Sequence, residues 1–196
     1  MRPWPALAAA AAWGGTAGPA CAPPGSLRPA SAIPAHRSGE VGFGEVLVSP
    51  RTYVDEPWGQ AAQAWATHSM GELVRISVVT AFDAEAFAGG LTLAVLPLQT
   101  DRLAAGLELE LGYAWAGLSF PLAARTVGPA WVYASPRLGT WGDDLTPAVP
   151  FGLDLHLADA VSARAEMQLS WADFEPNNRR FHYGLALAYQ FGESSR

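Results

Sequence analysis

The chain has 196 residues, enough for one domain, and 50% of them are hydrophobic while 15% are charged. Its net charge is -6 at pH 7, with no lysine and no basic cluster. This excludes a nucleic-acid surface, which concentrates Arg or Lys on one face. Beyond the N-terminus every apolar run is interrupted before it reaches the roughly 20 residues that a membrane-spanning helix needs.

The first 20 residues have the pattern of an export signal. Arg2 precedes an alanine-rich apolar run, 6–13, and small residues then lead to Cys21, the only cysteine of the chain. A positive start, an apolar middle and a small-residue cleavage region predict a signal peptide over 1–20. The order Gly18-Pro19-Ala20-Cys21 resembles a bacterial lipobox, which implies lipid modification of Cys21. Ordinary cleavage nearby, with Cys21 lost or left as an idle thiol, is the alternative.

Residues 21–39 are expected to form a linker. Four prolines, at 23, 24, 29 and 34, stand among Ser, Gly and Ala. Proline disfavours both the helix interior and the sheet, so an extended tether is expected here.

Two segments then predict a hairpin, VGFGEVLVS at 41–49 and QAAQAWATHS at 60–69, which is followed by a tight turn at 70–72. Eight further strands are expected after this turn, at 74–82, 86–97, 103–115, 118–123, 127–137, 149–157, 161–171 and 181–191. The fold class is therefore all-β, an antiparallel up-and-down barrel of ten strands if the hairpin belongs to it and eight if it does not.

The last segment, FHYGLALAYQF, shows the alternation most clearly. Its odd positions are all apolar, and its even positions are small or polar. Because successive side chains of a strand point to opposite faces, one face of each such strand is greasy. The apolar positions switch from odd to even after Trp115, so residues 115–117 are expected to form a tight turn.

The apolar face of these strands either fills a dry core or contacts lipid. A soluble barrel of the lipocalin or avidin type, or a sandwich, would turn it inward. The opposite face of these strands carries Arg, Glu and Gln, which argues for a lipid-facing apolar side. Aromatic residues stand at the strand ends, as in the interfacial girdles of membrane barrels. These aromatics are Trp115, Trp171, Phe181, Tyr183, Tyr189 and Phe191.

The connections support the lipid-facing interpretation. Short turns are expected at 70–72, 99–102, 125–129 and 158–160, all at one end of the barrel. Long loops are expected at the other end, at 50–59, 138–147 and 174–180. Long outer loops and short inner turns are typical of outer-membrane barrels.

On these features the chain resembles the small outer-membrane β-barrel class of Gram-negative bacteria, with the barrel over 40–192 and a tail at 193–196. The resemblance implies location in the outer membrane, lipid as neighbour and no cofactor. The alternation of Leu187, Tyr189 and Phe191 in the last strand also resembles the signal that the barrel-assembly machinery recognises during insertion.

The inward positions collect charges of both signs. They include Arg75, Glu108, Glu110, Asp154, His156, Arg164, Glu166 and His182. A narrow barrel is nearly filled by its own side chains, so we expect an ion-pair network that plugs the lumen. A narrow conduit for small solutes is the alternative.

Catalysis is a remote alternative. Asp154-Leu155-His156 resembles the Asp and His, two residues apart, of the omptin proteases. A likeness to lipid A deacylases fails, because His182, Ser170 and Glu166 are expected to face inward. No metal-binding or phosphate-binding motif is present. The outer loops carry residues that suit an extracellular ligand: Tyr53, Asp55, Glu56, Pro57, Trp58, Trp141, Asp143, Asp144, Asn177, Asn178, Arg179 and Arg180.

Overall fold

The computed structural model describes residues 27, 37–51, 55, 57–82, 87–112, 115–141, 144–171, 173–175 and 178–192. The expected signal peptide, Cys21 and the tail at 193–196 lie outside these residues. In the described part of the chain, no helix has the length and apolar character needed to cross a bilayer.

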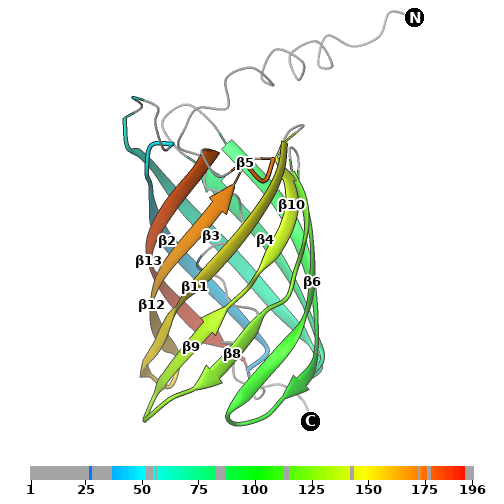
Figure 1. Ribbon diagram of the computed structural model, residues 1–196. Coiled ribbons are helices and arrows are strands. Elements are labelled where there is room, and N and C mark those ends of the chain that lie inside the picture. Colours follow the sequence, from blue (N-terminus) through cyan, green and yellow to red (C-terminus); the bar gives the residue numbers. More distant parts are fainter. Residues whose placement is uncertain are drawn as a thin grey trace, which may run out of the picture.

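Antiparallel strands form one closed barrel (Figure 1). They are β2 (Gly39–Val48), β3 (Gly59–Met70), β4 (Val74–Phe82), β5 (Phe87–Gln99), β6 (Leu103–Gly112), β7 (Trp115–Ser119), β8 (Leu122–Arg125), β9 (Ala130–Ala134), β10 (Arg137–Trp141), β11 (Asp144–Ala158), β12 (Val161–Trp171) and β13 (Arg179–Phe191). The barrel closes where β13 pairs with β2, with Gly39 opposite Phe191. The hairpin before residue 70 therefore belongs to the sheet.

Two barrel strands are each interrupted once. One of them consists of β7 and β8, which both pair with β6. The other consists of β9 and β10, which both pair with β11. The breaks fall at Pro121 and Pro136, because proline has no N–H to give to a ladder. The twelve segments therefore make ten barrel strands, which confirms the ten-strand expectation.

The two ends of the barrel differ in their connections. At the end that holds Gly39 and Phe191, the turns span only 71–73, 100–102, 126–129 and 159–160. At the opposite end, 49–58 and 172–178 are longer. We call these the short-turn end and the long-loop end.

The long loop expected at 138–147 is wrong. β10 runs on to Trp141 and β11 starts at Asp144, with Thr140 paired to Leu145. The Gly, Thr and Asp residues of this stretch suggested a loop. They are compatible with a hairpin. Gly139 packs closely against β7, because a Cβ at this position would come within 2.8 Å of the Ala116 carbonyl oxygen.

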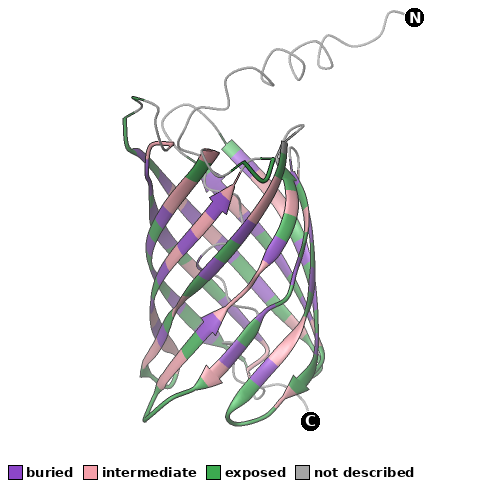
Figure 2. Cartoon of the chain, viewed as in Figure 1, coloured by how far each residue is buried: buried purple, intermediate pink, exposed green. Residues whose placement is uncertain are grey.

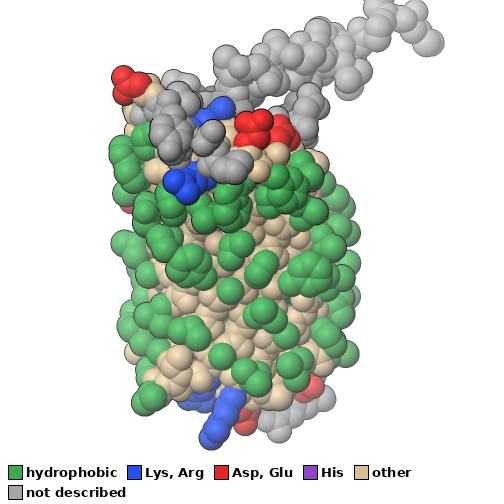
Figure 3. Space-filling model, in the orientation of Figure 1, with side chains coloured by type: hydrophobic (Ala, Val, Ile, Leu, Met, Phe, Trp, Pro, Cys, Tyr) green, Lys and Arg blue, Asp and Glu red, His purple; other side chains and the backbone are tan. Residues whose placement is uncertain are grey.

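The barrel has its apolar side chains outside and its charges inside. Buried and exposed residues alternate along the strands (Figure 2). On the visible face, hydrophobic side chains form a belt between charged residues at the two ends (Figure 3). Leu187 is 60% exposed and Leu109 is 44% exposed. A soluble barrel with a dry core is therefore excluded, because its apolar side chains would face one another.

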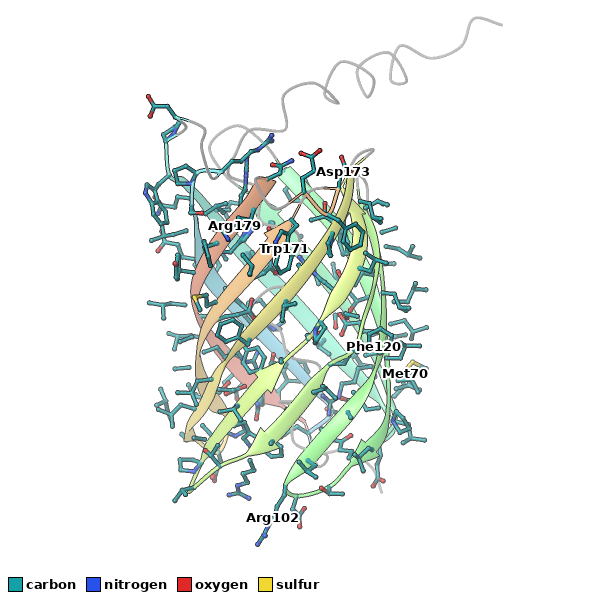
Figure 4. All side chains as sticks on the ribbon, in the orientation of Figure 1. Met70, Arg102, Phe120, Trp171, Asp173 and Arg179 are labelled. Carbon is teal, nitrogen blue, oxygen red and sulfur yellow. The ribbon has the colours of Figure 1, made fainter. Side chains whose placement is uncertain are left out.

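Labelled side chains in Figure 4 follow the same arrangement. Met70 and Phe120 point away from the barrel wall, Asp173 and Arg179 lie toward the long-loop end, and Arg102 lies at the short-turn end. An apolar belt with charged residues gathered at its two edges, as these labelled residues are, fits a hydrocarbon layer between two headgroup regions.

Trp115 corrects one expectation. It was expected on the lipid face at the end of a strand, but it is only 5% exposed and starts β7 on the inner face. The connection from β6 lies before Trp115, at 113–114, so the change of parity occurs earlier than expected. Gly90 makes room for the indole, since a Cβ there would lie 2.5 Å from Trp115 Cζ2.

One polar pair lies on the outer face. Glu45 of β2 and Gln60 of β3 are exposed, and the Gln60 amide donates a hydrogen bond to the Glu45 carboxylate. Gln60 is the second residue of β3 at the long-loop end, whereas Glu45 is paired with Leu185 further down the wall.

Candidate functional site

A buried arginine organises the lumen. Arg164 of β12 donates to both carboxylate oxygens of Glu40, at 2.8 and 2.5 Å, and its Nε donates to Asp154 Oδ2 at 2.7 Å. All three side chains are buried. One guanidinium between two carboxylates satisfies most of the hydrogen-bonding capacity of the group, which makes burial of these charges tolerable.

Neighbouring side chains complete this cluster. Trp65 Nε1 donates to Glu40 Oε1 at 2.8 Å, and its ring lies 5.6 Å from the Arg164 guanidinium carbon. His156 Nε2 lies 3.8 Å from Asp154 Oδ1. The cluster thus joins β2, β3, β11 and β12 across the interior.

A second group surrounds Glu166. Its Oε2 accepts hydrogen bonds from Tyr133 Oη and from the backbone N–H of Leu27, both at 2.9 Å. The Leu27 carbonyl accepts from Arg164 Nη1 at 3.3 Å. Leu27 belongs to the segment that was expected to be a linker, yet it is completely buried inside the barrel.

Further polar pairs lie elsewhere on the inner wall. Arg137 and Glu110 form an ion pair at 3.5 Å. Ser170 Oγ and His182 Nε2 lie 2.9 Å apart. Arg75 approaches the Gln99 amide, whose oxygen accepts from Arg75 Nη2 at 2.9 Å in the orientation that satisfies both of its groups.

All eight predicted lumen residues face inward. Arg164, Asp154 and His156 meet in one cluster and Glu166 adjoins it, and Glu110 and His182 contact Arg137 and Ser170 on the same inner wall. A single ion-pair network that plugs the lumen stays a prediction. Arg125 is exposed at the end of β8, where its Nε donates to the Gly128 carbonyl.

Several buried participants in these contacts were not among the predicted site residues. These are Leu27, Glu40, Trp65, Tyr133 and Arg137. Glu40 has the same parity as Gly42 and Gly44 on the inner face of β2, so the alternation could have revealed it. Leu27 has no periodic neighbourhood and gave no such signal.

Five of the six predicted interface aromatics lie on the outer face. Trp171, Phe181 and Tyr183 are near the long-loop end, and Tyr189 and Phe191 are at the short-turn end. Phe181 and Tyr183 stack with ring centroids 6.5 Å apart, and Trp58 lies 6.2 Å from Tyr183. Contact of these rings with lipid headgroups remains a prediction.

The Ser170–His182 pair is not a complete catalytic triad. No hydrogen-bond partner is found for His182 Nδ1 in the described part of the chain, so no carboxylate orients the ring. Among the described residues, no three His, Cys, Asp or Glu side chains are grouped to hold a metal ion.

No model of a known protein family matches the chain, and no curated protein matches it in sequence. Solved structures match in fold. The NanC porin is 12% identical with a TM-score of 0.50, over 79% of this chain and 100% of the porin. The KdgM porin is 8% identical with a TM-score of 0.47, over 79% and 99%. A designed transmembrane β-barrel is 9% identical with a TM-score of 0.44, over 81% and 97%.

The chain has the fold of a small outer-membrane β-barrel. At 12% identity the likeness concerns the fold alone. The membrane assignment follows from the barrel itself, because a closed sheet has no unpaired edge and its outer surface is apolar. This places the barrel in the outer membrane, with its charged side chains enclosed by the wall.

Proposed function

We propose that this barrel is closed to solutes and serves as a structural or surface-binding protein, through the rim at its long-loop end. The observation that carries the proposal is the set of side-chain contacts within the lumen. The Arg164 cluster connects β3, β2, β12 and β11, and Leu27 with Trp65 forms a buried apolar cluster beside it. An open pore would instead leave a continuous aqueous path between such groups.

The rim offers both charged and aromatic groups. Asp55, Trp58, Asp173, Glu175 and Arg179 are exposed there. Asp173 of the last loop is held to β11, because Asp173 and Leu145 exchange two hydrogen bonds, at 2.7 and 3.1 Å. A rim that is anchored in this way suits recognition of a partner at the cell surface.

Conductance in planar bilayers tests the proposal. The purified barrel is expected to insert without steady current steps. Reproducible ion-selective steps would overturn the closed lumen and favour the narrow conduit, which is the second candidate. That candidate is supported by Leu27, because this residue lies in the lumen but is not part of the wall. Its departure from the lumen would open space for solutes.

An omptin-like hydrolase is less well supported. In that chemistry the aspartate and histidine act on water. Here one oxygen of Asp154 is bound to Arg164 and the other faces His156. We therefore propose that Asp154 has a structural role as the anion that positions Arg164.

A further inference from the structure

Leu27 lies inside the barrel although it belongs to none of the barrel strands. It forms one buried apolar cluster with inward-facing wall residues, namely Val46, Val48, Trp65, Val79, Ala186 and Ala188. These wall residues make an apolar strip in the lumen. Without Leu27, water in the lumen would contact this apolar surface. Covering the surface with an aliphatic side chain removes it from water, which lowers the free energy.

Both backbone groups of Leu27 are held by side chains of β12. Its N–H donates to Glu166 and its carbonyl accepts from Arg164. These two side chains are held in place independently of Leu27, Glu166 by Tyr133 and Arg164 by Glu40. The hydrogen-bonding partners of the Leu27 backbone are therefore preorganised in the wall.

Two glycines leave space for the side chain. A Cβ at Gly44 would lie 2.6 Å from Leu27 Cδ1, and a Cβ at Gly184 would lie 2.6 Å from Leu27 Cδ2 and 3.0 Å from its Cγ. Either contact is closer than a Cβ normally makes, so another residue type at these positions would displace the leucine side chain. The wall thus has a notch, between Gly44 and Gly184, that matches a branched aliphatic side chain.

We propose that the lumen contains a binding site for one residue with a branched aliphatic side chain, and that Leu27 of the same chain is its occupant. The site consists of the Gly44–Gly184 notch, the apolar strip, and the paired acceptor and donor on Glu166 and Arg164. The closure of the lumen that we proposed above is then partly due to Leu27 rather than to the wall alone.

Chain length favours an occupant from the same molecule. Leu27 and Gly39, the first residue of β2, are 12 residues apart, which allows a reach of about 40 Å. Gly44 lies five residues along β2 from Gly39, or about 17 Å. The tether is therefore long enough without strain, and it gives Leu27 a high effective concentration at the site.

Disulfide trapping tests the site in the full-length chain with Cys21→Ser. The pair Leu27→Cys and Gly184→Cys should cross-link on mild oxidation in isolated outer membranes, seen as a mobility change on a non-reducing gel. The geometry allows this cross-link. A Cβ at Gly184 would lie 3.0 Å from Leu27 Cγ, and Leu27 Cβ is one bond of about 1.5 Å from that atom. A disulfide needs Cβ atoms roughly 3.5–4.5 Å apart. The matched control is Leu27→Cys with Leu185→Cys, because Leu185 is the next residue but faces lipid, and this pair should not cross-link.

A second measurement uses the accessibility of one cysteine. The single Leu27→Cys thiol should resist a water-soluble maleimide in the folded barrel and react after unfolding. Adding Gly184→Val should fill the notch and raise the labelling rate at least tenfold. Folding of each variant is checked by heat-modifiability on a detergent gel.

The outcomes separate this inference from the proposed function. Rapid labelling of Leu27→Cys in a folded barrel, or equal cross-linking at 184 and 185, would overturn the site. Cross-linking at 184 in a barrel that conducts ions would overturn the closed lumen and leave the site supported.

Discussion

Arg164 binds the carboxylate of Glu40, 124 residues earlier in the chain, through two hydrogen bonds inside the barrel. Glu40 is the second residue of β2, and Arg164 lies on β12, so the ion pair bridges the seam at which β13 and β2 close the sheet. The pair therefore joins the two ends of the sheet through the lumen as well as along the wall.

Removing the arginine should destabilise the barrel strongly. Arg164→Met leaves the Glu40 and Asp154 carboxylates buried without their common partner, which costs about 3–5 kcal/mol in comparable buried pairs. We expect the free energy of unfolding, measured by urea titration of the refolded barrel in detergent, to fall by this amount.

Two controls define the cause of that loss. The triple variant Glu40→Gln, Asp154→Asn and Arg164→Met removes all the charges together and should recover a large part of the lost stability. Arg102→Met, in an exposed turn, should have almost no effect. Equal losses in the single and triple variants would show that packing of the arginine stem, rather than charge pairing, is responsible.

Charge on the outer face should be costly in a depth-dependent manner. Leu109 of β6 is flanked by Leu93 and Leu118 on the neighbouring strands, so Leu109→Arg places a guanidinium in hydrocarbon. The expected cost is about 2–4 kcal/mol in the free energy of folding into lipid vesicles. Leu157→Arg, one residue from the short-turn end of β11, should cost only about 0–1 kcal/mol. Similar costs at both positions would contradict the assignment of the belt.

The glycines of the inner wall should be sensitive to added volume. A Cβ at Gly42 would meet the Trp65 ring, with Cη2 at 2.7 Å. Gly42→Val should therefore destabilise the barrel by about 1–3 kcal/mol, a typical cost of overpacking. Because the three nearest atoms belong to a side chain, Trp65→Ala should relieve the clash, and the double variant should lose less than the sum of the two single variants. Additive losses would show that the backbone is the obstacle.

The sequence predicted most of the wall and little of what fills it. Strict alternation over 181–191 fixed which side chains of β13 face lipid, because a one-residue error would reverse every one of them. The prediction for Trp115 was wrong, because the apolar positions change parity at the connection between β6 and β7. Alternation alone does not define where that connection lies. Alternation could not predict the place of Leu27 at all, because a single residue between prolines has no period, and only folding brings Glu166 and Gly184 to it.

The lipid-facing pair Glu45–Gln60 gives a prediction of the opposite sign. Glu45 lies opposite Leu185 on the outer face, where a carboxylate is disfavoured by hydrocarbon. Replacing both polar groups, as Glu45→Leu with Gln60→Leu, should stabilise the barrel by about 1 kcal/mol in vesicles, since acidic residues cost less than the 2–4 kcal/mol of basic ones at the membrane centre. The single variant Gln60→Leu should gain less or lose stability, because it leaves the Glu45 carboxylate without the hydrogen bond that the amide donates. Folding titrations of the three proteins in vesicles of one lipid composition would measure this. If the double variant is less stable than the parent barrel, the pair does not face hydrocarbon, and this part of the wall is covered by something other than lipid.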